Sequence, residues 1–234
     1  MGSMYGYIYE GTYKYEDFNK SGNTYTLKSN VPHYASEANT QPGMPKYRDL
    51  NGDGVIDSND RTVIGNGLPK HTGGFTNNFN YRDFDLSIFF QWSYGNDVLN
   101  ANRLMFESSW NRTRELNQYA SYAERWTESN PTSNIPRATS SSSNRVFSSR
   151  IIEDGSFLRL KTVTFGYTVP RKMISRVGIE QLRVYFAAQN LFTISNYSGY
   201  DPEVSIRESA LTPGLDFSAY PRARSFSFGI NLGF

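Results

Sequence analysis

Ser225-Phe-Ser-Phe-Gly-Ile-Asn-Leu-Gly-Phe234 closes the chain with a large apolar side chain at every second position. Small or polar residues fill the positions between them. A period of two is typical of a β-strand with one apolar face and one polar face. The alternation continues to an aromatic final residue, where soluble proteins usually have polar, fraying ends. It therefore predicts a strand in a closed sheet, because only closed sheets leave no unpaired edge in a membrane.

The composition of the 234-residue chain permits a membrane-embedded sheet and argues against several other classes. No stretch approaches 18 consecutive apolar residues, so we expect no transmembrane helix. The formal net charge is +2 and the charges are dispersed, so we expect no nucleic-acid partner. The absence of cysteine excludes disulfides and Cys-ligated zinc. The first residues do not form a signal peptide, and we expect the chain to be a piece of a longer protein.

Alternation like that of the last strand recurs along the chain. Two alternating runs are separated only by Arg82-Asp83, which predicts a tight hairpin. In a later run the apolar residues change face, and a bulge near Lys161 or Thr162 would explain this change. In all, the sequence predicts six strands, near residues 3–13, 73–82, 84–94, 155–169, 180–192 and 223–234.

The connections between these strands alternate in length. They are long at 14–72, 95–150 and 193–222, and short at 82–83 and 170–179. Outer-membrane barrels show the same alternation, because their periplasmic turns are short and their extracellular loops are long. We therefore expect an all-β fold: an antiparallel transmembrane β-barrel segment of about six C-terminal strands of a larger barrel, with long extracellular loops.

One long connection carries a metal-binding pattern. Within Asp49-Leu-Asn-Gly-Asp-Gly-Val-Ile-Asp-Ser-Asn-Asp60, oxygen side chains stand at loop positions 1, 3, 5, 9 and 12, with Gly54 at the sharp turn of position 6. Position 12 is Asp rather than Glu, which resembles dockerin-type loops more than EF-hands. The sequence predicts a structural Ca²⁺ on the extracellular side; a plain Asx/Gly turn is the alternative. The candidate ligands are Asp49, Asn51, Asp53, Asp57, Asp60 and the backbone carbonyl of Val55.

No catalytic arrangement is apparent. His33 and His71 lack metal-ligand spacing, Glu153-Asp154 reads as a turn, and no Gly-x-Ser-x-Gly motif is present. We therefore expect that the chain is not an enzyme. The stretch 113–126 predicts a short amphipathic helix, whose face carries Leu116, Tyr119, Ala120, Ala123 and Trp126.

A series of motifs spans nearly the whole chain. It comprises Gly6–Tyr13, Tyr47–Asp57 with Asp60-Arg61 and Ile64-Gly65, Gly73–Phe79, Phe84–Phe90 with Gly95–Asp97, Gly155–Lys161 with Phe165–Tyr167, Asn190–Thr193, Tyr197–Glu203, Tyr220–Arg222 and Phe228–Phe234. With these motifs, in this order, the chain resembles the C-terminal part of SusC/RagA-type TonB-dependent outer-membrane transporters.

The resemblance implies import of oligosaccharides or peptides across the outer membrane of a Gram-negative cell. It also implies a SusD-like lipoprotein that caps the barrel, contact with outer-membrane lipid, and a TonB complex that acts through an N-terminal plug. Barrels of this class have roughly 22 strands, and the plug lies outside this sequence. We therefore do not expect the chain alone to be competent for transport.

A secreted, β-rich carbohydrate-binding module with a structural calcium loop is the alternative. Exposed aromatic side chains are common sugar platforms, but the aromatic girdles of a barrel explain the same residues. The candidate platform residues are Trp92, Trp110, Trp126, Tyr197, Tyr200 and Tyr220.

Overall fold

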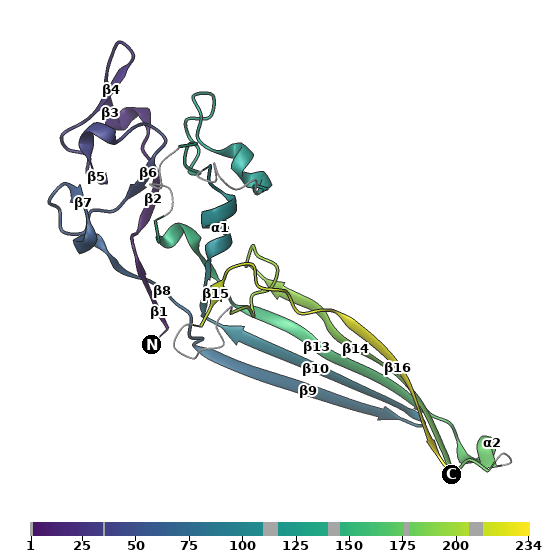
Figure 1. The fold of residues 1–234 in the computed structure, drawn as a ribbon. Helices are drawn as coiled ribbons and strands as arrows, with labels where there is room; N and C mark the ends of the chain where they lie inside the picture. The colour runs from purple at the N-terminus through teal and green to yellow at the C-terminus, as the bar shows by residue number, and fades with distance from the viewer. Residues whose placement is uncertain (1, 35, 110–116, 140–145, 176–177, 206–212) are drawn as a thin grey trace. The chain divides into compact units, whose positions relative to one another are not determined.

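A five-stranded antiparallel sheet is the largest element of the structure, which is a computed structural model describing residues 2–34, 36–109, 117–139, 146–175, 178–205 and 213–234. The sheet order is β16-β14-β13-β10-β9, and Figure 1 shows these long strands side by side. Within the described ranges, no helix is both long and apolar enough to cross a membrane. The strands are β9 (His71–Tyr81), β10 (Phe84–Tyr94), β13 (Phe157–Thr168), β14 (Gln181–Ser195) and β16 (Ser225–Gly233).

The chain divides into two units. The sheet unit consists of Pro69–Asn96, Asp154–Val204 and Tyr220–Phe234. The loop unit consists of Met1–Leu68, Asp97–Glu153 and Ser205–Ala219. The five sheet strands lie where the sequence predicts strands. The loop unit is built from the N-terminal stretch and from parts of the three long connections.

The stretch 3–13, expected to be a sixth strand of the same kind, differs. It forms two short strands, β1 (Ser3–Gly6) and β2 (Tyr9–Thr12), in the loop unit. They pair with β8 (Thr62–Asn66) and β6 (Pro45–Tyr47), not with the large sheet. Both pairings shift register, and Gly11 lies at φ 107. A positive φ interrupts a regular strand, so the tyrosine alternation there does not reflect one long strand.

The predicted bulge is confirmed at Lys161. Thr162 pairs with Phe89 and Gln189, whereas Leu160 pairs with Phe90 and Phe192, so Lys161 is left out of both ladders. On β14 the same irregularity includes Asn190, which adopts φ 51. Lys161 is one residue more than regular alternation allows, and one extra residue moves every following side chain to the other face of the sheet. The bulge thus compensates for the change of face in the sequence of β13. Leu158 and Leu160 therefore share a face with Val163, Phe165 and Tyr167.

The hairpin between β9 and β10 is also confirmed. Tyr81 pairs with Phe84, so only Arg82 and Asp83 form the turn, with Arg82 at φ 52. The connection between β13 and β14 is short and contains α2 (Arg171–Ile174). Both short connections lie at one end of the sheet, and the long connections leave from the other end.

The polar face of the sheet is shaped by glycines. Asp85 on β10 and Arg183 on β14 form a two-point ion pair that passes over Gly166 of the strand between them. A Cβ on Gly166 would lie 2.4 Å from both Arg183 Nη2 and Asp85 Oδ1. In the same way, the ring of Tyr185 lies over Gly229. These glycines let large side chains lie flat across the strands.

The loop unit buries aromatic side chains between short strands. One cluster contains Tyr7, Tyr47 and Ile56, and a second contains Tyr13, Phe18 and Leu27. The long connection 14–72 also contains several short elements. The loop unit contains β3 (Phe18–Ser21), β4 (Thr24–Leu27), β5 (His33–Tyr34), β7 (Val55–Ile56), β11 (Asp97–Asn100), β15 (Leu215–Asp216), α1 (Ala101–Phe106) and the 3₁₀ turns η1 (Tyr15–Asp17), η2 (Glu37–Asn39), η3 (Ser58–Asp60), η4 (Ala120–Glu124) and η6 (Ser149–Ile151), with β12 (Ile152–Asp154) at the boundary between the units.

The helix predicted over 113–126 is wrong for its described part. Residues 110–116, including Leu116, lie outside the described ranges, and the rest forms only the 3₁₀ helix η4. Tyr119 is extended at φ −64 and ψ 143, so no α-helix enters from it. Tyr122 and Trp126 are buried instead, and the Trp126 ring lies against Gly43. Packing of large rings thus overrides the weak helical period.

The glycine under the ion pair gives a first prediction. Gly166→Ala is expected to destabilise the folded protein by about 1–3 kcal/mol, because the new methyl group displaces a hydrogen-bonded charge pair. Gly233→Ala is the matched control on the same face, since its Cβ would meet only Gln181, at ordinary distances of 3.4 Å to Cβ and 3.8 Å to N. Thermal unfolding in detergent gives the melting temperatures of both variants. Equal melting temperatures for the two variants would contradict the role assigned to Gly166.

Candidate functional site

The Asp49–Asp60 loop lies in the loop unit between β6 and β8. Gly52 and Gly54 adopt φ 77 and 85, which favours glycine at both positions. The Asp49 carboxylate accepts hydrogen bonds from their backbone N–H groups, at 2.6 and 2.9 Å. The first half of the loop therefore folds around the Asp49 side chain.

The second half of the loop is organised by Asp60. Its side chain is fully buried and accepts hydrogen bonds from Leu50 N at 2.7 Å and Asp57 N at 2.8 Å. Burial raises the pKa of Asp60, but these backbone donors outweigh it, so the pKa lies below its ordinary value. Asp57 in turn accepts from Asn59 N and caps η3. Asp60 is thus held as a carboxylate that ties the two ends of the loop together.

The candidate ligands are gathered in one loop but do not point at one centre. Asp53 accepts from Val55 N at 2.8 Å, and Asn51 accepts from Asp53 N at 3.0 Å, as local Asx turns do. Val55 is exposed and pairs with His33 between β5 and β7. Among the described residues, no three Asp, Glu or His side chains are grouped as metal ligands. The oxygens present suit Ca²⁺ chemically, but the side chains would have to turn to surround an ion.

The residues considered for catalysis have structural partners. His71 begins β9, stacks on Tyr94 and accepts a hydrogen bond from Trp92 Nε1. Glu153 accepts from Asn100 Nδ2 and forms an ion pair with Arg103. Asp154 accepts from Ser156 N. These contacts orient strands and turns.

The candidate sugar-platform residues are scattered between the two units. Trp92 lies on the sheet, where its ring covers Gly73, and Trp126 is buried in the loop unit. Tyr197 is buried, whereas Tyr200 and Tyr220 are 86% and 90% exposed. Trp110 lies outside the described residues. The structure therefore does not gather these residues into one platform.

The sheet presents an apolar face across all five strands. Register aligns Leu86, Phe165, Phe186 and Phe228 in one row, with Phe79 opposite Leu86 on β9. Phe228 is 82% exposed, and many neighbours on the face are also exposed. Exposed apolar patches of this extent mark contact with a membrane or another protein. The strands have 9 to 15 residues, enough to cross a bilayer when tilted.

A buried ion network ties the last long connection to the polar face. The Arg159 side chain is 2% exposed and donates to Asp201, which also accepts from the backbone N–H of Glu203 and Arg222. Glu203 forms further ion pairs with Arg159 and Arg222. Sequence reasoning missed this network. The available signal was a charged residue between Leu158 and Leu160 in a strand.

Comparison with known proteins identifies the family. No family model matches the chain. Over all of this chain, it is 34% identical to TonB-dependent receptor P3 of Formosa agariphila and 30% identical to TonB-dependent receptor P39 of the same organism. It is 30% identical to TonB-dependent receptor SusC of Bacteroides thetaiotaomicron over 85% of the chain. The chain therefore belongs to the TonB-dependent receptor family, of the SusC/RagA type.

The solved structures agree in fold. The RagAB peptide transporter matches 99% of the chain with a TM-score of 0.74 at 23% identity, and the RagAB peptide importer in the closed-closed state matches with 0.72 at 24%. The chain spans 22%, 25% and 18% of the lengths of P3, P39 and SusC, and 22% of the first RagAB chain. It thus corresponds to only a part of each relative.

The ion network gives a second prediction. Asp201→Asn removes the charge that faces buried Arg159, so we expect a loss of about 3 kcal/mol of local stability and faster protease cleavage within 196–224. Mass spectrometry of a limited digest locates the cuts. Glu180→Gln, at the exposed pair with Arg171, is the control and leaves the pattern unchanged.

The same network sets a pH dependence. Burial raises the pKa of Asp201, but hydrogen bonds from Arg222 N, Glu203 N and Arg159 outweigh it, and the pKa is lowered. A lowered carboxylate pKa contributes stability above the unfolded value near 3.9 and loses it as pH falls through the folded value. Protease resistance of the wild type should therefore persist from pH 7 to about pH 4.5. Loss of resistance already at pH 6 would contradict the assignment to Asp201.

Proposed function

We propose that this chain is the C-terminal part of the barrel of an outer-membrane transporter that imports oligosaccharides or peptides. In this proposal a SusD-like surface lipoprotein caps the barrel, and a TonB complex supplies energy through an N-terminal plug. Family membership and the resemblance to SusC support the class of transporter. The RagAB structures describe a peptide transporter, which makes peptides one of the two substrate classes to test.

The apolar face of the sheet is the observation that carries the proposal. Burial of apolar surface is worth about 25 cal/mol per Å², so an exposed row of Phe, Ile and Leu is costly in water. Outer-membrane lipid would cover this face at no such cost. The opposite face carries Asp85, Arg183 and Lys161, and such groups suit a water-filled lumen.

The open edges of the sheet complete the argument. β9 and β16 each have one sheet neighbour among the described strands. An unpaired strand edge is not tolerated in hydrocarbon, so both edges would pair with further strands of a full barrel. Transport therefore belongs to the whole receptor, not to these residues alone. The relatives are receptors, which agrees with a role other than catalysis.

A charge on the lipid face tests the proposal. In the full-length receptor, Phe228→Lys places an ammonium group near the middle of β16 and is expected to cost about 2–4 kcal/mol. The recovered amount of heat-modifiable receptor in the outer-membrane fraction should fall. Ser227→Lys, one residue away on the polar face opposite Ala187, should leave it unchanged. Recovery of the wild type in the soluble fraction would overturn the proposal.

We also propose that the Asp49–Asp60 loop binds one structural Ca²⁺. The spacing of its oxygens, the turn at Gly54 and the deprotonated Asp60 support this. The Asp53 and Asp57 side chains are exposed and hold only local turns, so they can rotate toward an ion.

Calorimetry tests the calcium proposal directly. After chelator treatment, titration of the full-length receptor with CaCl₂ should release heat and raise the melting temperature. Asp53→Ala should lose both effects, because it removes a carboxylate ligand from the loop. Asp83→Ala, an exposed aspartate in the β9–β10 turn, is the control. Equal heats from the wild type and Asp53→Ala would eliminate this site.

A further inference from the structure

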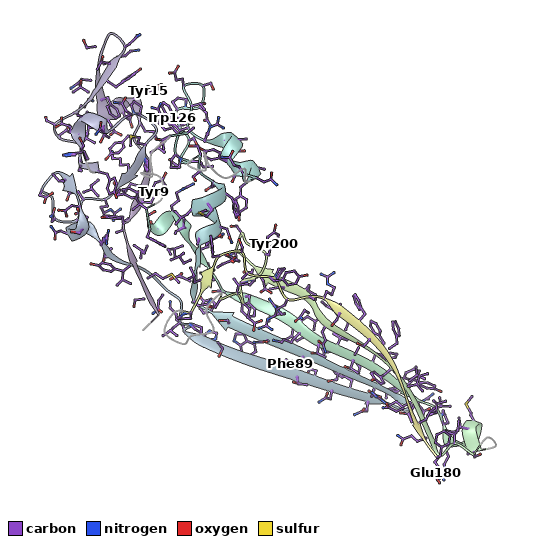
Figure 2. The ribbon with its side chains drawn as sticks, viewed as in Figure 1. Tyr9, Tyr15, Phe89, Trp126, Glu180 and Tyr200 are labelled. Carbon is purple, nitrogen blue, oxygen red and sulfur yellow. The ribbon has the colours of Figure 1, made fainter. Side chains whose placement is uncertain are left out.

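The loop unit contains a pocket of about 420 Å³. Its lining includes no residue of the Asp49–Asp60 loop or of the five-stranded sheet. It is lined by residues from η1, from β4 and from the segment around Trp126. Its volume is within the range of small-molecule sites, roughly 300–1,000 Å³. Figure 2 shows Tyr15 and Trp126 close together in this unit. The main lining residues are Tyr15, Tyr25, Gln41, Arg125, Trp126 and Arg137.

Three aromatic rings line the pocket. The Tyr15 ring lies 5.2 Å from Tyr25 and 5.6 Å from Trp126, both tilted rather than stacked flat. Trp126 is held by its backbone bond to Ile135 and by close packing on Gly43. Its indole Nε1 is buried without a hydrogen-bond acceptor among the described residues. The Trp126 ring is therefore fixed in position before any ligand arrives.

The charge around these rings is mainly positive. Arg125 and Arg137 line the pocket together with a single carboxylate, Glu128. Lys20 lies over the Tyr25 ring at 5.4 Å, and Arg137 lies over the Trp126 ring at 5.5 Å. Burial, Tyr25 and Glu128 raise the pKa of the Tyr15 hydroxyl, whereas Lys20 and Arg137 lower it. The positive charges of Lys20 and Arg137 are therefore close enough to affect the aromatic rings. Among the described residues, no ion pair joins Arg125 to a carboxylate.

We propose that this pocket binds an acidic sugar residue of an anionic oligosaccharide. The C–H face of a pyranose packs on aromatic rings, its hydroxyl groups pair with the amide of Gln41 and with Glu128, and its carboxylate faces Arg125. Guanidinium–carboxylate contacts are the strong, directional ones of such sites. An acidic peptide matches the charge but offers no pyranose C–H face for the aromatic cluster. The inference rests on the proposed function, because it specifies one substrate class among those named there.

Titration of the full-length receptor in detergent tests this pocket. The probes are tetragalacturonate, its tetramethyl ester and tetraglutamate. The ester keeps the sugar rings but removes the charge, and tetraglutamate keeps the charge but has no sugar rings. Tetragalacturonate should bind at least tenfold more tightly than either of the others. Arg125→Gln should weaken its binding by about tenfold or more and leave ester binding unchanged, because one charge-assisted contact is lost.

Two further variants control for charge and for folding. Glu128→Gln removes the one carboxylate of the pocket and should strengthen tetragalacturonate binding. Arg171→Gln makes the same change as Arg125→Gln at an exposed site of the sheet unit and should have no effect. Should Arg125→Gln fail to fold, Glu128→Gln and the ester comparison still decide the question.

The possible outcomes separate this inference from the function on which it rests. Equal affinity for the acid and the ester, tighter binding of tetraglutamate, or no binding of any probe would each overturn the acidic-sugar pocket. If the receptor nevertheless fractionates with the outer membrane, the transporter proposal stands. A receptor absent from the outer membrane would overturn the transporter proposal itself.

Discussion

The rest of the sheet depends on keeping one alternation in phase across five strands. In a strand, one residue too many transfers all later side chains to the opposite face. The Lys161 bulge absorbs such a residue on β13, at the level where β14 has its own irregularity at Asn190. Without the bulge, Leu158 would lie on the polar face and Arg159 on the apolar face. Apolar and polar faces therefore remain separate along the full length of β13 and β14.

This separation determines where charge is placed. Arg159, Arg183 and Asp85 all share the polar face, and each has a partner there. Gly166 has no side chain, so the Asp85–Arg183 pair can pass directly over the backbone of the middle strand. A Cβ at this position would lie within the ion pair, so a glycine here has a physical reason. Which residues lie on the polar face is therefore set by the register of the strands, not by the strand propensity of each residue.

The long strands, the hairpin and the bulge could be predicted because each rests on a repeated pattern of many residues. The short strands β1 and β2 could not, since four residues carry no usable period. Their positions depend on distant contacts, such as Tyr9 N to Ser149 Oγ and Thr12 Oγ1 to Ser133 O. For the Asp49–Asp60 loop, spacing predicted the turns but not the direction of each carboxylate. The aromatic pocket joins residues more than a hundred positions apart, and no local signal marks it.

The loop unit is stabilised differently from the sheet. Its core is built of tyrosines and of buried charge: Glu107 is 1% exposed and binds Arg150, Arg103 and Ser121. These contacts join α1, η4 and η6, which come from different parts of one long connection. Polar contacts of this kind are directional, so they specify one arrangement where an apolar core of the same size would permit several. The strands require only that apolar and polar residues alternate, whereas the loop unit requires particular hydrogen-bond and ion-pair partners. Sequence changes in the loop unit can therefore alter the aromatic pocket while the register of the sheet stays fixed.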